Sequence, residues 1–464
     1  MAQNIEEYDA IIIGTGQGGM PLAQALDQAG WKTGIIERKY VGGTCINYGC
    51  TPTKTMVASA RIAYLAKRAG DFGVHVPSVS VNLEEVRQRK QGVVESFRGG
   101  SEQRLTDAEN IELIRGHGRF VDTHIVEVES ENNGSRRLTA DHIFINTGGR
   151  PREVNIPGIE EIEPLDSTSI MELSELPDHL VVIGGGYIGL EFGQMFRRFG
   201  SRVSIVQRGD QVLTREDRDV ADEVLDILQD DGIDVYLDSE VTRIVNESDG
   251  EITFTISTPD RDVNVEGSHL LVAAGRIPNT DDLNLEAAGI EQNKRGQVVV
   301  NDKLETSVEG VYAIGDVRPG LQFTHISYDD YRILQTNILK GGDASTEGRL
   351  VPYTVFIDPQ LGRIGLSEEQ AKARNIDYQL AKLPLEYVAR AIETGETRGF
   401  MKALVDPDSE RILGCSILGS QGGEIMSMLQ IAMMGDLPYT ALKEGVFTHP
   451  LFAEALNSLF FTLE

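Results

Sequence analysis

The N-terminal part of the chain alternates short apolar runs with helical patterns. Residues 8–13 form a short apolar run that predicts a buried strand, and residues 20–29 have the apolar spacing of an amphipathic helix. Between them lies Gly14-Thr15-Gly16-Gln17-Gly18-Gly19, and a second apolar run follows at residues 33–36. A buried strand, a glycine turn and a helix in this order predict a dinucleotide-binding βαβ unit.

The residue types of this unit suit a nucleotide. Gly14, Gly16 and Gly19 permit a tight turn and let the backbone approach a pyrophosphate at the helix N-terminus. Glu37 follows the second apolar run, where a carboxylate can accept both ribose hydroxyls. We therefore expect these four residues to bind a dinucleotide.

The same arrangement occurs again in the middle of the chain. Residues 180–183 predict a strand, residues 190–199 a helix, and residues 203–206 the next strand. The turn between the first two carries the second fingerprint, Gly184, Gly186 and Gly189. A chain with two such units needs two dinucleotides.

The second unit lacks the acidic residue that would bind a ribose. Gln207 and Arg208 follow its second strand instead. An arginine suits a 2′-phosphate, so NADP(H) is favoured, and NAD(H) is possible. The alternative is that Arg208 is only a solvated surface charge.

Two of the three cysteines are close together in the sequence. Cys45 and Cys50 lie in Gly43-Thr44-Cys45-Ile46-Asn47-Tyr48-Gly49-Cys50-Thr51-Pro52, and Pro52 suits the first turn of a helix. Three cysteines are too few for a disulfide scaffold, and a helix start lowers a thiol pKa, so the pair predicts a redox-active disulfide. The residues do not favour the pair as half of a metal site. Cys415 lies in an apolar run, which predicts a buried core thiol. We expect no metal site.

The charge balance disfavours some classes of partner. Forty-three Lys and Arg residues stand against 72 Asp and Glu, a formal net charge of −29, which repels nucleic acid and anionic membranes. No run approaches the roughly eighteen apolar residues of a membrane span, and the N-terminus is polar and acidic, so we expect a cytoplasmic protein. The 12 lysines and 31 arginines resemble a salt-adapted composition, or a surface tuned only for solubility.

A candidate acid–base pair stands near the C-terminus. His449 precedes a proline and lies five residues before Glu454. An imidazole oriented by a carboxylate can activate a thiol or protonate it as it leaves.

These residues, taken in order, resemble the pyridine nucleotide-disulfide oxidoreductase family, which contains dihydrolipoamide dehydrogenase, glutathione reductase and mercuric reductase. The resemblance runs from about Tyr8 to the C-terminus. Further markers are the segments Ile145-Asn146-Thr147-Gly148-Gly149-Arg150-Pro151, Ala273-Ala274-Gly275-Arg276-Ile277-Pro278-Asn279 and Tyr312-Ala313-Ile314-Gly315-Asp316.

The resemblance implies FAD as the first dinucleotide and a nicotinamide cofactor as the second. Asp316 would hold the ribityl chain, Thr44 and Lys54 would lie beside the flavin ring, and Glu191 would pair with Lys54 near the nicotinamide. Tyr187 would cover the flavin ring, although core packing is its alternative role. The motif residues implied to contact a cofactor are Gly43, Thr147, Gly148, Gly275 and Gly315.

The resemblance also assigns the two thiols different roles. Cys50 would lie against the flavin as the charge-transfer thiolate, and Cys45 would be the outer thiol that meets the acceptor. His449 and Glu454 would come from the partner subunit of a homodimer, so that the active site is shared between the subunits.

The acceptor is open at this point: a small molecule or a metal ion. No cysteine follows Cys415, unlike the C-terminal pair of mercuric reductases, which makes efficient mercury reduction doubtful. Tyr48, Thr51 and residues 327–332 resemble the mercuric-reductase-like branch, although Tyr328, Asp329 and Asp330 could equally be a helix surface. Dihydrolipoamide dehydrogenase is the alternative in the family. A flavin-dependent NADH oxidase or monooxygenase is the alternative of another class, and it would not need the cysteine pair.

The expected fold class is α/β, with two Rossmann-like dinucleotide-binding domains and a C-terminal α+β dimerisation domain. The FAD-binding domain would cover residues 1–150 and the NAD(P)-binding domain residues 151–275. Residues 276–348 would complete the FAD domain, and residues 349–464 would form the interface domain.

Overall fold

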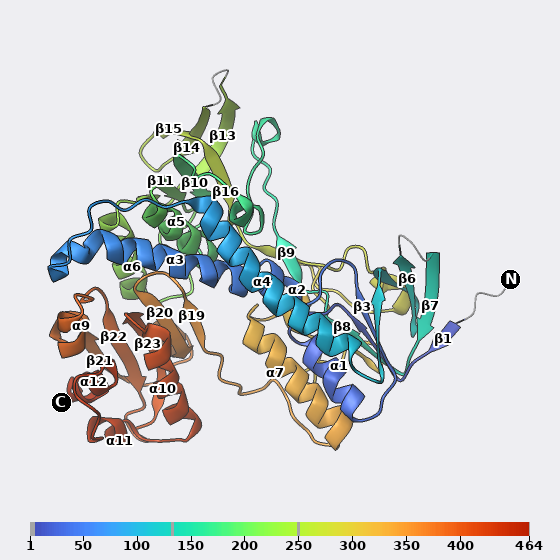
Figure 1. The fold of residues 1–464 in the computed structure, drawn as a ribbon. Coiled ribbons are helices and arrows are strands. Elements are labelled where there is room, and N and C mark those ends of the chain that lie inside the picture. The colour runs from blue at the N-terminus through green and yellow to red at the C-terminus, as the bar shows by residue number, and fades with distance from the viewer. Residues whose placement is uncertain (1–4, 131–133, 248–250, 464) are drawn as a thin grey trace. The chain divides into compact units, whose positions relative to one another are not determined.

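The computed structural model describes residues 5–130, 134–247 and 251–463. The chain forms two compact units, each assembled from separate stretches of sequence (Figure 1). Unit 1 comprises Met1–Thr55, Glu85–Arg152 and Gly275–Arg349, and unit 2 comprises Met56–Glu84, Glu153–Ala274 and Leu350–Glu464. The division into four regions made from the sequence stays a prediction.

Unit 1 is built on a parallel sheet with the strand order β18-β8-β2-β3-β4. The strands are β2 (Ala10–Ile13), β3 (Thr33–Glu37), β4 (Ile111–Arg115), β8 (His142–Ile145) and β18 (Val311–Ala313). Strand β2 begins at Ala10, later than the apolar run suggested, because Asp9 is exposed and its carboxylate accepts the backbone N–H of Lys32 at 2.7 Å. Residues 10–13 of β2, 35–36 of β3 and 143–145 of β8 are apolar because both faces of the sheet are buried there.

Helices α1 (Gly19–Gln28) and α7 (Thr324–Leu334) lie side by side in this unit (Figure 1). A smaller sheet has the order β1-β7-β6-β5, and strands β9 and β17 form a separate antiparallel pair. The bounds of these strands are β1 (Ile5–Glu7), β5 (His117–Asp122), β6 (Ile125–Ser130), β7 (Gly134–Thr139), β9 (Gly149–Pro151) and β17 (Arg276–Pro278). The pairing of β9 with β17 joins two of the sequence motifs, around Arg150 and Arg276.

The segment with the cysteine pair forms α2 (Gly43–Asn47) and the start of α3 (Cys50–Arg68). Helix α3 crosses from unit 1 into unit 2 at Met56, and α4 (Leu83–Thr106) returns the chain to unit 1. Cys50 is therefore the first residue of a helix, as Pro52 suggested.

Unit 2 contains a second parallel sheet with the order β12-β11-β10-β16. Its strands are β10 (His179–Ile183), β11 (Arg202–Val206), β12 (Asp234–Tyr236) and β16 (His269–Val272). Helices α5 (Tyr187–Phe199) and α6 (Arg218–Asp230) follow β10 and β11, and an antiparallel sheet consists of β13 (Glu240–Asn246), β14 (Ile252–Ser257) and β15 (Asp262–Gly267). This is the second βαβ unit that the sequence predicted.

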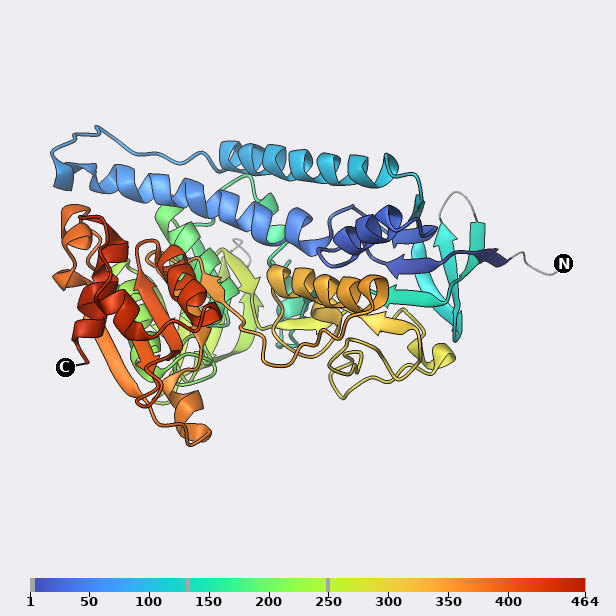
Figure 2. The ribbon, with the colours of Figure 1, turned by 90° about the horizontal axis from the view of Figure 1, so that it is seen from below.

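The C-terminal part of unit 2 is an antiparallel sheet with the order β19-β20-β23-β22-β21. The strands are β19 (Tyr353–Val355), β20 (Gln360–Gly365), β21 (Gln379–Pro384), β22 (Phe400–Val405) and β23 (Ile412–Gly419). The helices are α8 (Glu368–Ala373), α9 (Ala389–Glu393), α10 (Gly422–Met434), α11 (Tyr439–Lys443) and α12 (Ala455–Phe461). Helices α10 and α12 pack against the sheet around Leu429 and Leu456 (Figure 2). The expected α/β fold class is confirmed.

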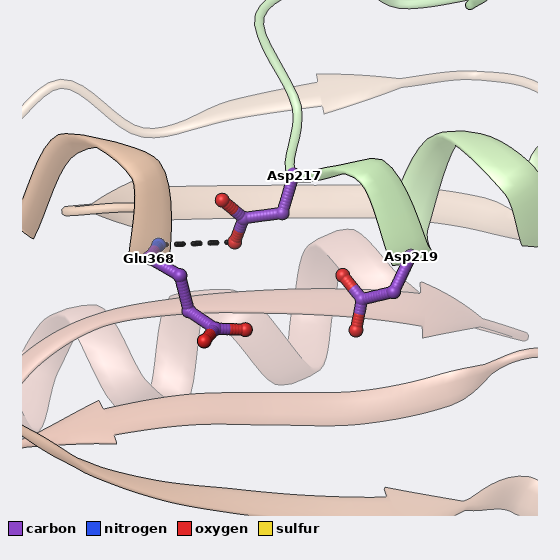
Figure 3. A group of neighbouring side chains, drawn as sticks. All are labelled: Asp217, Asp219 and Glu368. Atoms are coloured by element: carbon purple, nitrogen blue, oxygen red, sulfur yellow. Dashed lines mark hydrogen bonds between the residues drawn. The ribbon is translucent and has the colours of Figure 1, made fainter. Parts of the chain in front are cut away.

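Unit 2 contains a buried ammonium group that contacts three carboxylates. The side chain of Lys402, on β22, is 1% exposed, and its Nζ lies 3.0 Å from Asp217 Oδ2, 2.8 Å from Asp219 Oδ1 and 2.6 Å from Glu368 Oε1. Asp217 also accepts the backbone N–H groups of Glu368 and Glu369, each at 3.0 Å (Figure 3). We call these four residues the Lys402 cluster.

The three carboxylates of the Lys402 cluster are close enough together to hold a metal ion, as their arrangement in Figure 3 shows. The ammonium contacts all three, however, so the cation between them is supplied by the chain. Within the described ranges of the chain, no helix is long and apolar enough to cross a membrane.

Candidate redox and nucleotide-binding sites

The first glycine turn is held against the end of β8. Gly14 has a φ of +104°, and a Cβ there would lie 2.5 Å from the carbonyl oxygen of Asn146. A Cβ on Gly19 would lie 2.5 Å from Nδ2 of Asn146, which donates to the carbonyl of Gly14 at 3.0 Å. Only glycine lets α1 begin this close to the sheet.

Glu37 is fixed beside this turn at the end of β3. Its side chain is almost fully buried, Oε2 accepts the hydroxyl of Thr15 at 2.5 Å, and Oε1 accepts the backbone N–H of Lys39 at 2.8 Å. A Cβ on Gly43 would lie 2.7 Å from Cα of Gly16, so the α2 start also closes on the turn. A narrow glycine cradle beside an oriented carboxylate fits the adenylate half of a dinucleotide.

Asp316 lies after β18 in the same unit. Burial raises the pKa of its carboxyl, while Arg276, whose Nη2 is 3.7 Å away, lowers it. Gly315 has a φ of +72°, and a Cβ there would lie 2.7 Å from Ser327 Oγ. The backbone before Asp316 is therefore pressed against α7.

Two of the marker motifs bind each other through a pair of side chains. Thr147 Oγ1 donates to the carbonyl of Asn279 at 2.8 Å, and Asn279 Nδ2 donates to the carbonyl of Thr147 at 2.8 Å. Gly148 and Gly275 both have positive φ, and a Cβ on either would meet open space. The positive φ values alone therefore explain why these two positions are glycine, since no close contact excludes a Cβ there.

The second glycine turn repeats the geometry of the first. Gly184 has a φ of +113°, and a Cβ on Gly189 would lie 2.0 Å from the carbonyl oxygen of Gly184. Gly186 has open space beside it. Tyr187, the first residue of α5, is a partly exposed aromatic ring, which argues against its alternative role as core packing.

The residues after β11 differ from those after β3. Gln207 Oε1 accepts the backbone N–H of Gly185 at 2.9 Å, so this side chain supports the turn itself. The side chain of Arg208 is 87% exposed, and its Nε lies 3.5 Å from Glu240 Oε2. An exposed guanidinium loses little when it exchanges such a surface partner for a phosphate.

Cys45 and Cys50 belong to unit 1 and interact with each other. The hydrogen bond to Cys50, followed by burial, raises the pKa of the Cys45 thiol. The helix start that Pro52 suggested lies at Cys50, and the largest effect on the pKa of Cys45 is its hydrogen bond to Cys50.

Thr324 is a site residue that the sequence did not reveal. Its hydroxyl lies 3.5 Å from Cys50 Sγ, and its hydrogen bond to Cys45 lowers the pKa of that thiol. Thr324 is the first residue of α7 and is distant from the cysteines in sequence. The only sequence signal was its position a few residues after the motif that ends at Asp316.

His449 and Glu454 are brought together as their spacing suggested. Nδ1 of His449 lies 2.8 Å from Glu454 Oε2, and the imidazole is 67% exposed. Glu191 is buried on α5, and its Oε1 accepts the backbone N–H of Phe356 at 2.8 Å. Lys54 belongs to unit 1 and Glu191 to unit 2, so their pairing stays a prediction.

Three uncertain residues now have defined surroundings. Cys415 is buried, which raises the pKa of its thiol to about 12 and confirms it as a core residue. The ring of Tyr48 lies 6.4 Å from that of Tyr40, with Lys39 Nζ 5.2 Å from its centroid. Asp330 is fully buried, so a helix surface is the wrong interpretation for it.

Two glycine cradles of the dinucleotide-binding type and a thiol pair at a helix start define a two-nucleotide disulfide oxidoreductase. The family of pyridine nucleotide-disulphide oxidoreductases matches residues 8–330, and the dimerisation domain of that family matches residues 351–460. The chain belongs to this family, whose members are FAD-dependent and use NAD(P)H.

Relatives cover nearly the whole chain. It is 40% identical over 460 residues to the probable pyridine nucleotide-disulfide oxidoreductase RclA of Escherichia coli, with 98% of this chain and 99% of the relative covered. It is 36% identical to a mercuric reductase of Lysinibacillus sphaericus, with 98% and 82% covered. Among solved structures, the Cu(II) complex of the HOCl-induced flavoprotein disulfide reductase RclA from E. coli matches with a TM-score of 0.90 and 39% identity, covering 99% of this chain and 100% of that one.

Proposed function

We propose that the protein passes electrons from NAD(P)H through FAD to a Cys45–Cys50 disulfide and then to a small-molecule or metal-ion acceptor. One observation supports this most directly: the two interacting thiols lie in the same unit as the first glycine cradle and Asp316. FAD, when bound, supplies the transfer of two electrons from the nicotinamide to the disulfide.

The chain's own residues account for the proton and the thiolate. Hydride equivalents reduce the disulfide to one thiol and one thiolate, so two electrons and one proton arrive together. We assign the proton to Cys45 and the thiolate beside the flavin to Cys50, as the resemblance implies, and the raised pKa of Cys45 supports this assignment. Thr324, 3.5 Å from Cys50 Sγ, can donate a hydrogen bond to that thiolate.

Cys45 must lose its proton to react with an acceptor. In our proposal His449, oriented by Glu454 and supplied by the partner subunit of a homodimer, takes this proton. The match to the dimerisation domain and the exposure of the imidazole support this arrangement. Lys54, Glu191 and Tyr187 would lie near the reacting rings, as the resemblance implies.

We propose NADP(H) as the preferred nicotinamide cofactor. The exposed Arg208 beside the second turn supports this choice, because a guanidinium can bind a 2′-phosphate in a bidentate manner. The cytoplasm is the proposed compartment, where a thiol pair can be cycled by NADPH.

A soft metal ion is the acceptor class that we favour, with disulfides as the other class. Thiolates bind soft ions well, and this chain is similar to mercuric reductases and to a structure solved as a Cu(II) complex. A panel of cupric and mercuric ions, oxidised glutathione, lipoamide, quinones and oxygen would identify the acceptor. Oxidation of NADPH only by oxidised glutathione or lipoamide would favour disulfides over a metal ion, and oxidation only by oxygen or quinones would contradict both acceptor classes.

Anaerobic titration of the FAD-loaded protein with NADPH tests the electron path. A long-wavelength thiolate-to-flavin absorption band should appear after two-electron reduction and should be lost in Cys50→Ser. Cys415→Ser is the matched control, because Cys415 is a core thiol, and it should retain the band. A band that is absent from the wild type, or that survives in Cys50→Ser, would refute the mechanism.

A further inference from the structure

Asp330 is a buried carboxylate on the inner face of α7. It is 0% exposed, and Oδ2 accepts the backbone N–H of Gly315 and Nε of Arg318, each at 2.9 Å. Oδ1 accepts Nη2 of Arg318 at 2.5 Å and Nη1 of Arg349 at 2.8 Å. A buried carboxylate is costly unless charges and hydrogen bonds compensate it, and here two guanidinium groups and one amide do so.

The Gly315 contact links Asp330 to the proposed ribityl-binding residue. Gly315 directly precedes Asp316, and Asp330 holds its N–H while Ser327, one helical turn earlier on α7, blocks any Cβ at Gly315. The side of α7 that carries Ser327 and Asp330 therefore fixes the backbone from which the Asp316 carboxylate extends.

The contact with Arg318 has a second consequence. Arg318 is buried close enough to Asp316 to lower the pKa of that carboxyl, against the larger effect of burial. Both Nε and Nη2 of Arg318 are directed to Asp330. If Asp330 lost its charge, the guanidinium of Arg318 would have Asp316 as its alternative anion. The carboxylate of Asp316 would then be drawn away from a ligand hydroxyl.

We propose that Asp330 is a positioning residue for FAD: it orients Asp316 through Gly315 and prevents Arg318 from pairing with Asp316. This inference rests on the proposed function, because it assigns the ribityl chain to Asp316. It also gives a role to the acidic segment after His325 that the sequence left undefined.

Three variants separate this role from general stability. Asp330→Asn removes the charge, Arg318→Gln removes the competing cation, and the double variant Asp330→Asn/Arg318→Gln removes both. Asp329→Asn is the matched control, because Asp329 is the adjacent carboxylate, is partly exposed, and contacts Arg349 at 3.2 Å without contacting Gly315.

The measurement is titration of the apoprotein with FAD, followed by the change in flavin fluorescence. Asp330→Asn should weaken FAD binding by about tenfold or more, the loss expected when a hydrogen-bonded charge is removed. The FAD affinities of Asp329→Asn and Arg318→Gln should stay within about threefold of the wild-type affinity, a smaller change than the one expected for Asp330→Asn. The double variant should bind FAD more tightly than Asp330→Asn, because no free guanidinium then competes for Asp316.

Two results would overturn the proposal: FAD affinity of Asp330→Asn within about threefold of the wild type, or a double variant no better than Asp330→Asn. Should Asp330→Asn not fold, as judged by circular dichroism, the double variant is compared with Arg318→Gln, and equal FAD affinities would likewise overturn it. Failure of the electron path is detected separately, as FAD-loaded wild-type protein without a thiolate band, and does not affect this comparison.

Discussion

The two units use the same glycine cradle and surround it with different charges. In both turns a positive-φ glycine and a close glycine contact let a helix begin against the sheet. After β3, Glu37 is a buried acceptor, whereas after β11 Gln207 supports the turn and Arg208 is exposed. The two turns therefore share their backbone packing, and the side chains around them differ in charge and exposure.

The two units also differ in their buried charge clusters, whose central groups have opposite charges. Unit 1 has one carboxylate, Asp330, between two guanidinium groups, and unit 2 has one ammonium, Lys402, between three carboxylates. A second, partly exposed carboxylate, Asp329, also contacts Arg349 at 3.2 Å, so the first cluster beside the proposed flavin site has two carboxylates and two guanidinium groups. The second joins the start of α6 to β22 and α8.

Removal of the ammonium should have the largest effect and should be confined to unit 2. Lys402→Met leaves three carboxylates without their cation, and we expect a loss of about 3 to 5 kcal/mol in the free energy of unfolding. Urea denaturation measures this loss, and FAD affinity should be unchanged.

The control for this substitution is Lys382→Met. The ammonium of Lys382 also contacts Asp219, at 2.6 Å, but its side chain is 37% exposed. The control should therefore lose less than about 1 kcal/mol. Equal stability of the two variants would show that the Lys402 cluster does not stabilise the unit.

The Lys402 cluster should also make stability depend on pH. Burial raises the pKa of Asp217, Asp219 and Glu368, but hydrogen bonds, including those from Lys402, outweigh burial and hold all three below their usual values of 3.8 and 4.5. The stabilisation that the three carboxylates give to the folded protein is therefore complete above the usual pKa values of 3.8 and 4.5. It is lost as the pH falls through the lowered pKa values of the folded protein.

Urea midpoints measured between pH 3 and pH 7 would test this dependence. The difference in stability between wild type and Lys402→Met should shrink as the pH falls below about 4, where the carboxyl groups become protonated. A difference that is constant across this range would contradict the assignment.

A smaller effect should separate the two nucleotide sites. Arg208→Glu replaces a phosphate-binding group by a repelling one, so the ratio of kcat/KM for NADPH to that for NADH should fall about 10- to 100-fold. Arg261→Glu makes the same charge change at an exposed turn and should leave the ratio unaltered. An unchanged ratio in Arg208→Glu would leave Arg208 as a surface charge.

The smallest predicted effect concerns the thiols of unit 1. Thr324→Val removes the hydroxyl that lowers the pKa of Cys45, so this pKa should rise further. Alkylation of Cys45 at a fixed pH in the reduced protein, followed by mass spectrometry, should slow by about twofold to tenfold. Thr324→Ser keeps the hydroxyl and should react at the wild-type rate. Equal alkylation rates in Thr324→Val and Thr324→Ser would show that the Thr324 hydroxyl does not affect Cys45.

Local patterns predicted the parts of the fold that local physics determines. The glycine fingerprints, the strands around Ile11 and Val181 and the helix start at Cys50 follow from apolar runs and turn residues, and the structure contains them. The motifs of the family are also short and local in sequence, so they identified the class of the chain.

The residues that the sequence did not predict act through contacts between distant segments. Thr324 meets Cys50 across 274 positions, and Lys402 meets Asp217 across 185. For Asp330 the sequence left a helix surface open as an alternative, because an acidic side chain on a helix is usually exposed, and only the packing of α7 shows its two arginine partners. The pKa of Cys45 likewise depends on where Cys50 lies, which the sequence does not show.

The burial of Lys402 also makes it a natural reporter for chemical labelling. An amine that is 1% exposed and held by three carboxylates cannot meet an acylating reagent unless unit 2 opens around it. The rate at which this one lysine is acylated, relative to exposed lysines, therefore measures how often the C-terminal sheet separates locally from the start of α6.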